Sequence, residues 1–448
     1  MESYARWTTK EELINLLTKV NPKEEIKTSG IAMDYDSDNL YLDTTDAATL
    51  VIGGQASGKT QVTSLPLIKS TCKAGESIII NDVGGNFYEN TSKEFINNNY
   101  DVKVINFSDA TKTNYYNPLT LPYLLYKEGN KDKALELTKN LSYYIYRDEE
   151  DADAFWINSS RDYFNGIILY LFEKAKEEEI NLSSVYSLSI SLNESKKLLE
   201  EINSLDKTNS IYIYLTNIIN APKETKGGIV ATFTQHLTQY IAKENLSNML
   251  SSNDINLTSI TKNKTAIYII NKPEQLANTL ASLLINQLIE ATIIYGKKER
   301  RLNILLDEFN NLAPICNLSN LINYTRSLNI RFTILLNSYI ELKNKYGEEE
   351  SELIKYSCSN IIYLLAKDDY TLEEISKLCG NQSSKLALIT KEELRTLKMF
   401  EAIILKTRVM PIKTKLKPDY LIEWNSDFSE NKDYPQTILK EKNIYTYE

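Results

Sequence analysis

One stretch near the start of this 448-residue chain determines its architecture: Thr49-Leu50-Val51-Ile52-Gly53-Gly54-Gln55-Ala56-Ser57-Gly58-Lys59-Thr60. The last eight residues match the pattern G-x-x-x-x-G-K-[ST] at every fixed position. In such a loop the glycines let backbone amides wrap a phosphate, and the apolar residues before it predict a buried strand. We therefore predict a strand, a phosphate-binding loop and a helix whose amino-terminal dipole favours anions.

This loop supplies the candidate nucleotide-binding residues. Lys59 is expected to neutralise charge on the β- and γ-phosphates of ATP, and Thr60 to offer its hydroxyl to Mg²⁺. A fortuitous glycine-rich turn is the alternative, but the strand before the loop and the helix after it favour a true phosphate loop. The candidate set is Gly53, Gly54, Gln55, Ala56, Ser57, Gly58, Lys59 and Thr60.

A second motif, Asn303-Ile304-Leu305-Leu306-Asp307-Glu308-Phe309, places two acids at the end of an apolar strand. Asp307 is predicted to hold Mg²⁺ through water, and Glu308 to polarise the water that attacks the γ-phosphate. A strand that ends in acidic loop residues is common, so this motif alone is weak evidence for a metal site. Together with the phosphate loop it is strong evidence.

Two further polar residues follow the acidic motif. Arg326 suits phosphate contact because its charge is fixed, and it could act as an arginine finger across a subunit boundary. Asn337 ends the next apolar strand, where a polar side chain can sense the γ-phosphate. Either residue could instead be a surface ion-pair partner.

Short apolar strands alternate with helix-length stretches in much of the chain, which is typical of a parallel α/β sheet. Residues 121–260 instead show helical periodicity and predict an all-α insertion. The predicted division is an α/β domain over 1–120 and 261–424, an all-α domain over 121–260, and a polar, mobile tail over 425–448. Further expected elements are a helix over 9–20 and strands over 77–81, 102–107, 265–271, 302–307, 330–336, 361–365 and 402–405.

Composition narrows the function classes. The chain carries 51 Lys and Arg against 60 Asp and Glu, a net charge of -9, which argues against a generally basic protein that coats nucleic acid. Residues 121–260 hold 14 basic and 20 acidic side chains, which contributes -6 of that charge and suggests either a solvated face or a docking surface. One histidine and four scattered cysteines give no zinc or disulfide pattern, and no apolar signal peptide or membrane-length run is present.

Several motifs together resemble the type IV secretion coupling proteins, the TraG-like ATPases of conjugation. Residues 3–12 (SYARWTTKEE) are similar to the opening of that family, and residues 115–118 (YYNP) to its Tyr-Asn-Pro turn. Residues 153–156 (DAFW) resemble the start of its all-α domain, and residues 305–312 (LLDEFNNL) its acidic strand end. Residues 325–327 (TRS) lie in the helix that follows.

The resemblance implies a RecA-like P-loop ATPase domain with an inserted all-α domain, working as a homo-hexameric ring with ATP and Mg²⁺. It implies a protein that recruits a relaxase, as part of a relaxosome, with its single-stranded DNA to a type IV secretion channel and drives their transfer. The alternatives are an ATP-binding docking adaptor with little hydrolysis, and a coupling ATPase for protein effectors only.

The chain departs from the family pattern at several positions. Residues 80–88 lack the Pro, Lys and Glu that the family has after Asp82, and Asn337 stands where the family generally has Gln. No arginine precedes Gly53 within twenty residues, so Arg326 is the better finger candidate, with Arg331 in reserve. Family members usually begin with transmembrane helices. We therefore expect a chain that is cytoplasmic as given and lies at the cytoplasmic face of the plasma membrane, through a missing segment or a partner protein.

Overall fold

The computed structural model describes residues 4–147, 154–296 and 299–447, so Ser3 and Asp153 of the family-like motifs lie outside the described residues. The chain forms two compact units. Unit 1 contains the described residues of 1–104, 258–273 and 292–433, and unit 2 those of 105–257, 274–291 and 434–448.

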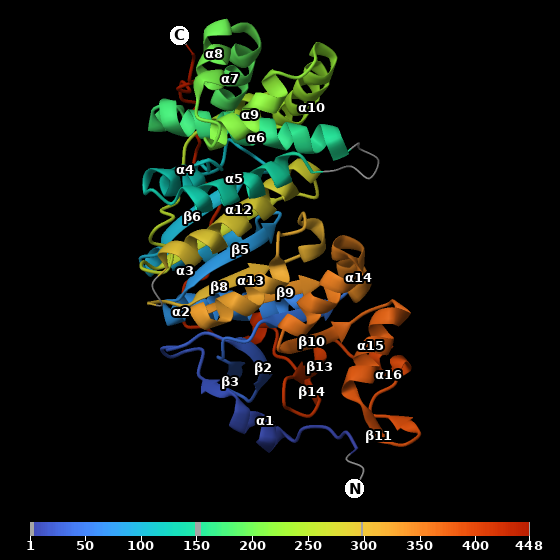
Figure 1. The fold of residues 1–448 in the computed structure, drawn as a ribbon. Helices are drawn as coiled ribbons and strands as arrows, with labels where there is room; N and C mark the ends of the chain where they lie inside the picture. Colours follow the sequence, from blue (N-terminus) through green and yellow to red (C-terminus); the bar gives the residue numbers. More distant parts are fainter. Residues whose placement is uncertain (1–3, 148–153, 297–298, 448) are drawn as a thin grey trace. The chain divides into compact units, whose positions relative to one another are not determined.

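Unit 1 is built on a nine-stranded sheet in the order β14-β13-β10-β4-β9-β8-β5-β7-β6, in which β6 begins in unit 1 and ends in unit 2. Figure 1 labels β14, β13, β10, β9, β8, β5 and β6 of this sheet. Five central strands are parallel and nearly all their residues are buried, which explains their continuous apolar runs. β10 is parallel to β4, whereas β13 and β14 run antiparallel at one edge. The strands are β4 (Thr49–Gly53), β5 (Ser77–Val83), β6 (Asp101–Asn106), β7 (Thr265–Asn271), β8 (Leu302–Leu306), β9 (Ile330–Leu336), β10 (Asn360–Leu365), β13 (Glu401–Lys406) and β14 (Ile412–Lys415).

The register of the central strands brings their carboxyl ends to one edge. Ile52 of β4 pairs with Leu336 of β9, and Leu306 of β8 pairs with Ile334 of β9. The loops that follow these three strands therefore start at the same edge of the sheet.

Helices and short elements join the strands of unit 1. They are α1 (Lys10–Leu16), the π-helix η1 (Thr60–Ser64), α2 (Leu65–Ala74), α3 (Asn86–Asn97), the 3₁₀ turns η3 (Phe309–Asn311) and η4 (Arg326–Leu328), α13 (Leu318–Thr325), α14 (Tyr339–Ser357), α15 (Asp369–Cys379) and α16 (Lys391–Arg395). The helix predicted over 9–20 ends early, because Leu17 is extended and β1 (Thr18–Val20) pairs with β3 (Leu40–Asp43). β3 also pairs with β2 (Ile31–Tyr35) to complete a small sheet.

Unit 2 is helical. Its core includes the stacked rings of Tyr146 and Phe233, whose centroids lie 6.0 Å apart, with Phe164 against both. The helices are α4 (Thr120–Lys127), α5 (Lys131–Ile145), α6 (Ala154–Lys174), α7 (Leu182–Glu194), α8 (Lys196–Ser204), α9 (Ser210–Ile219), α10 (Lys223–Ile241) and α11 (Glu244–Met249).

Helix α12 (Gln275–Tyr295) contributes residues to both units. By length and composition it is the one helix among the described residues that could cross a membrane, but 83% of its most apolar 18-residue window is buried. Burial of this extent is ordinary for the core helix of a folded domain.

The carboxyl-terminal segment differs from the expected mobile tail. Within unit 1 the amide of Asn431 donates to the carbonyl of Glu89 at 2.7 Å. Within unit 2 the amide of Tyr445 donates to Ser184 Oγ at 3.0 Å, and Asn181 Nδ2 donates to the carbonyl of Asn443 at 2.8 Å. The segment has few apolar residues, but its backbone finds hydrogen-bond partners on helices, which polarity alone did not reveal.

The mixed α/β fold with a parallel sheet and a helical insertion confirms the predicted fold class. The predicted domain bounds remain a prediction, since the compact units interleave along the chain at positions that periodicity does not mark.

Candidate nucleotide site

The phosphate loop follows β4 directly and leads into η1 and then α2. Lys59 turns its ammonium group back onto its own loop, where it donates to the carbonyls of Gly53 and Gly54, the latter at 3.5 Å. It also donates to Asn337 Oδ1 at 3.0 Å. The structure thus brings Lys59 and Asn337, predicted separately from sequence, into direct contact.

Two loop positions accept only glycine. A Cβ on Gly53 would lie 2.4 Å from Ser57 Oγ. Gly58 has φ +87°, and a Cβ there would lie 2.7 Å from Cε1 of Phe400. The motif glycines are therefore required by close approach and by backbone conformation.

The loop carries unused hydrogen-bond donors. Among the described residues, the amides of Gln55, Ala56 and Gly58 have no acceptor, and the buried Ser57 hydroxyl has no partner. Adjacent free amides beside an ammonium group form an anion-binding concavity. This donor set fits the phosphates of a nucleotide.

The acidic pair lies at the end of β8. Burial and the neighbouring Glu308 carboxylate raise the pKa of Asp307 to about 6, against the opposing effect of Lys59. The backbone carbonyl of Asp307 accepts a hydrogen bond from Asn81 Nδ2 of β5 at 2.6 Å, which fixes the strand end. Glu308 is exposed, adopts left-handed φ +43°, and accepts from Asn311 Nδ2 at 2.7 Å.

Lys59 carries its positive charge among three nearby carboxylates. Burial lowers the pKa of Lys59, while Asp307, Glu308 and Glu341 act in the opposite direction. The residues therefore offer one ammonium, one hydroxyl and carboxylates of the kind that Mg²⁺ shares with nucleotide phosphates. No group of three or more His, Cys, Asp or Glu side chains that could hold a metal ion forms among the described residues.

Asn337 follows β9 and is oriented by a residue that the sequence analysis missed. Its Nδ2 donates to Glu341 Oε1 at 3.2 Å, and its backbone amide lies 3.3 Å from Glu341 Oε2. Glu341 lies four residues after Asn337, a helical spacing that could have identified it.

The two arginine candidates lie elsewhere. Arg326 is exposed in η4, which precedes β9, so it lies at the amino-terminal edge of the sheet, opposite the phosphate loop. Arg331 is buried, and its guanidinium donates to Ser29 Oγ at 2.7 Å and to Asn303 Oδ1. Arg331 therefore belongs to the core of unit 1, and its reserve role as a finger was wrong.

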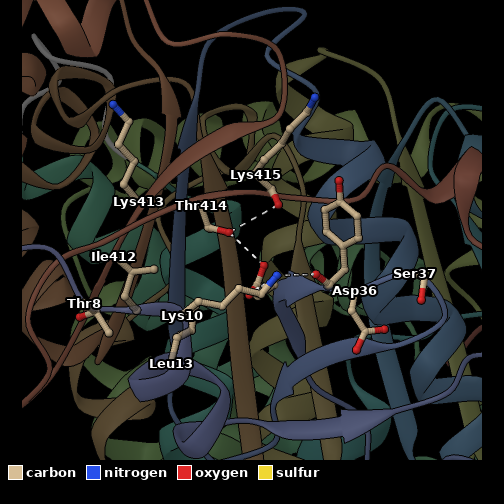
Figure 2. A pocket seen from close by; sticks show the side chains of 11 residues that line it. Thr8, Lys10, Leu13, Asp36, Ser37, Ile412, Lys413, Thr414 and Lys415 are labelled. Carbon is tan, nitrogen blue, oxygen red and sulfur yellow. Dashed lines mark hydrogen bonds and ion pairs between the residues drawn. The ribbon is translucent and has the colours of Figure 1, made fainter.

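A separate pocket of about 450 Å³ lies in unit 1 between α1, β2 and β14. Lys10 Nζ reaches the carbonyl of Tyr35 at 3.4 Å and lies 3.9 Å from Asp34 Oδ2 (Figure 2). Thr414 Oγ1 donates to Asp34 Oδ1 at 3.2 Å, while Lys413 and Lys415 extend away from Lys10 (Figure 2). Asp34, the buried carboxylate of this pocket, already has Thr414 and Lys10 as partners, and none of the predicted site residues lines the pocket.

The strand, the phosphate loop and the acidic strand end define a P-loop fold of the RecA-like type. The plasmid coupling protein TrwB, solved in complex with the ATP analogue ADPNP, superposes with a TM-score of 0.69 at 14% identity, covering 97% of each chain. VirB4 of Thermoanaerobacter pseudethanolicus gives a TM-score of 0.54 at 13% identity over 89% of this chain and 100% of that one.

Sequence comparison identifies the family. The chain matches the family described as Type IV secretory system Conjugative DNA transfer over residues 2–396, and it belongs to that family. The type IV secretion system-coupling protein VirD4 of Bartonella quintana (strain Toulouse) is 25% identical over 164 residues. That alignment covers 36% of this chain and spans a quarter of VirD4.

Proposed function

We propose that this protein is an ATP-hydrolysing coupling protein that recruits relaxase-bound single-stranded DNA to a type IV secretion channel and drives its transfer. One observation carries the proposal: a phosphate loop with free amides lies at the same sheet edge as Asp307 and Asn337, in a chain that belongs to a conjugative DNA transfer family. The solved relatives that contain an ATP analogue or ADP with Mg²⁺ support the same ligands here.

The proposed roles follow from the side-chain chemistry. Lys59 leaves its loop carbonyls and binds the β- and γ-phosphates, and Asn337 contacts the γ-phosphate. Glu308 polarises the attacking water. Thr60 and Asp307 would hold Mg²⁺, which would supply positive charge to the phosphates.

Lys59→Ala and Glu308→Gln should reduce ATP hydrolysis to background, measured as phosphate release with and without single-stranded DNA. Glu308→Gln should still bind a fluorescent ATP analogue, because the phosphate loop is intact. Glu373→Gln, an exposed carboxylate on α15, is the matched control and should match wild type. Unchanged turnover in both site variants would exclude an ATPase at this site, and binding without turnover in wild type would favour the docking adaptor.

Arg326 is proposed to complete the nucleotide site of a neighbouring subunit in a homo-hexameric ring. Its place at the far edge of its own sheet supports contact with another copy rather than with its own phosphate loop. Arg326→Ala should lower turnover by about 10³-fold. Mixing it with Lys59→Ala should restore activity, because one variant supplies an intact loop and the other an intact arginine. No recovery in mixtures that form rings, as measured by analytical ultracentrifugation, would remove Arg326 from this role.

A second candidate substrate is supported by the charge of residues 121–260. Their 14 basic and 20 acidic side chains repel phosphodiesters and attract basic protein segments. The same ATPase would then couple protein effectors. Turnover stimulated by a relaxase or basic effector, but not by single-stranded DNA, would favour this candidate.

The site of action is proposed to be the cytoplasmic face of the plasma membrane, through a membrane segment or a partner protein. Co-sedimentation with membranes only when other secretion components are present would support a partner. Recovery in the soluble fraction under all conditions would contradict membrane association.

A further inference from the structure

Helix α14 begins two residues after Asn337 and is broken in its middle. Gly347 has φ +79° and ψ 175°, which separates a first segment, residues 339–346, from the rest of the helix. The first segment carries Glu341 and Lys345, which lie four residues apart and therefore on one face.

Glu341 fixes which way the Asn337 amide points. A carboxylate can only accept and an ammonium can only donate, so Nδ2 of Asn337 must face Glu341 and Oδ1 must face Lys59. In this orientation Asn337 presents an acceptor to the centre of the site.

The γ-phosphate needs the opposite presentation. Phosphate oxygens accept hydrogen bonds, so Asn337 contacts them best through Nδ2 after its amide turns over. The turn would direct Oδ1 at the Glu341 carboxylate, where two acceptors meet without a proton. Glu341 therefore opposes the arrangement that ATP requires and stabilises the arrangement that ties up Lys59.

Lys345 reaches the other side of the site. Its ammonium donates to the carbonyls of Phe309 at 3.1 Å, Asn310 at 2.5 Å and Leu312, all in the turn after Glu308. The next residue, Tyr346, stacks on Phe309 with ring centroids 5.8 Å apart and planes 7° apart. The turn that carries Glu308 is thus fastened to the same short segment that holds Asn337.

We infer that residues 339–346 of α14 form a positioning element that links the γ-phosphate side of the site to the turn carrying Glu308. Glu341 acts through Asn337 to favour the nucleotide-free arrangement, and Lys345 acts through the 309–312 turn to place Glu308. The inference rests on the proposed ATPase function and adds two positioning residues to it.

Glu341→Gln tests the first half. A glutamine can accept from Nδ2 or donate to Oδ1, so it tolerates both orientations of the Asn337 amide. The Kd for a non-hydrolysable ATP analogue should fall about three- to tenfold, the equivalent of one hydrogen bond, while the Kd for ADP changes less than about twofold. The ratio of the two constants is the readout, because general loosening of the helix would weaken both ligands together.

The matched control is Glu349→Gln, an exposed carboxylate in the second part of the same helix. It should leave both constants at wild-type values. Equal shifts for ATP analogue and ADP in Glu341→Gln, or no shift in either, would overturn the assignment of Glu341.

Lys345→Met tests the second half, since methionine keeps an unbranched stem and removes the ammonium. Turnover should fall at least about tenfold because Glu308 loses its placement, while the Kd for the ATP analogue stays within about twofold of wild type. Lys343→Met, on the same segment but paired with Glu348 at 2.5 Å, is the control. Unchanged kcat in Lys345→Met would overturn this role.

These outcomes separate the inference from the function on which it rests. Wild-type protein that neither binds nor hydrolyses ATP would remove the proposed function. Active wild-type protein, with Glu341→Gln and Lys345→Met behaving as their controls do, would remove the positioning element alone.

Discussion

Asp82, at the end of β5, accepts hydrogen bonds from the amides of Phe87 at 3.0 Å and Tyr88 at 2.8 Å, in the first turn of α3. The side chain is buried, and burial raises its pKa to about 7 despite these two donors. The loop after Asp82 lacks the Pro, Lys and Glu of the family pattern, so no role for it was apparent from sequence. The structure gives Asp82 the task of satisfying free amides at a helix start.

This raised pKa predicts a pH dependence of stability. Folded Asp82 holds its proton up to about pH 7, whereas the unfolded group has a pKa of 3.8. The stabilisation that Asp82 gives the folded state is fully present below pH 3.8 and is lost as pH rises to about 7. Between these two pH values the free energy of unfolding falls by about 1.4 kcal/mol for each pH unit. From pH 5 to pH 8, the free energy of unfolding of wild type should fall by about 2–3 kcal/mol more than that of Asp82→Asn. Parallel pH profiles in urea denaturation would show that Asp82 does not titrate in this range.

Some of the site residues lie in recognisable sequence motifs, and others do not. Lys59 and Asp307 could be proposed from sequence because each lies in a short motif whose residues also adjoin one another in space. Asn81 was not, since it acts on Asp307, which only the sheet register brings near. Glu341 was missed although it lies only four residues after Asn337, the residue that it orients. Arg331 was held in reserve as a finger on the absence of an arginine before Gly53, which says nothing of burial, and Ser29 and Asn303 satisfy its guanidinium inside the core.

Among the elements, β7 and β9 match their predicted bounds because long, buried parallel strands produce uninterrupted apolar runs. The small sheet of β1, β2 and β3 was missed, since strands this short hold together only through their pairing. The break in α14 was missed as well, because a single glycine such as Gly347 among helix-forming residues does not by itself predict a positive φ.

Two glycines should respond oppositely to the same substitution. Gly347→Ala should lower the free energy of unfolding by about 1–3 kcal/mol, because φ +79° with ψ 175° is open to glycine alone. Gly227→Ala, in the helical interior of α10 with open space around it, should raise stability by about 0.5–1 kcal/mol. Thermal unfolding of both variants provides the check, and stabilisation by Gly347→Ala would mean that α14 is continuous in solution.

At the scale of the whole molecule, the carboxyl-terminal segment from residue 434 packs against the helices of unit 2. Lys440 lies 4.8 Å from the Tyr115 ring centroid, and Tyr447 donates to Glu201 at 3.2 Å. Removing residues 434–448 should therefore increase amide exchange in α7 and α11, which the segment contacts. Exchange in α13 should be unchanged, since α13 lies in unit 1. Equal amide exchange in α7 and α11 of the truncated and the full-length protein would show that the segment does not protect unit 2.

The chain passes between the two units five times, after residues 104, 257, 273, 291 and 433. A ribosome delivers residues in order, so neither unit has its full complement of contacts until almost the whole chain has emerged. The nascent protein must therefore carry unpaired apolar strands through most of its synthesis, which favours capture by chaperones and makes slow translation a hazard. For the same reason, pieces of this protein cut at simple boundaries for expression should be prone to aggregation.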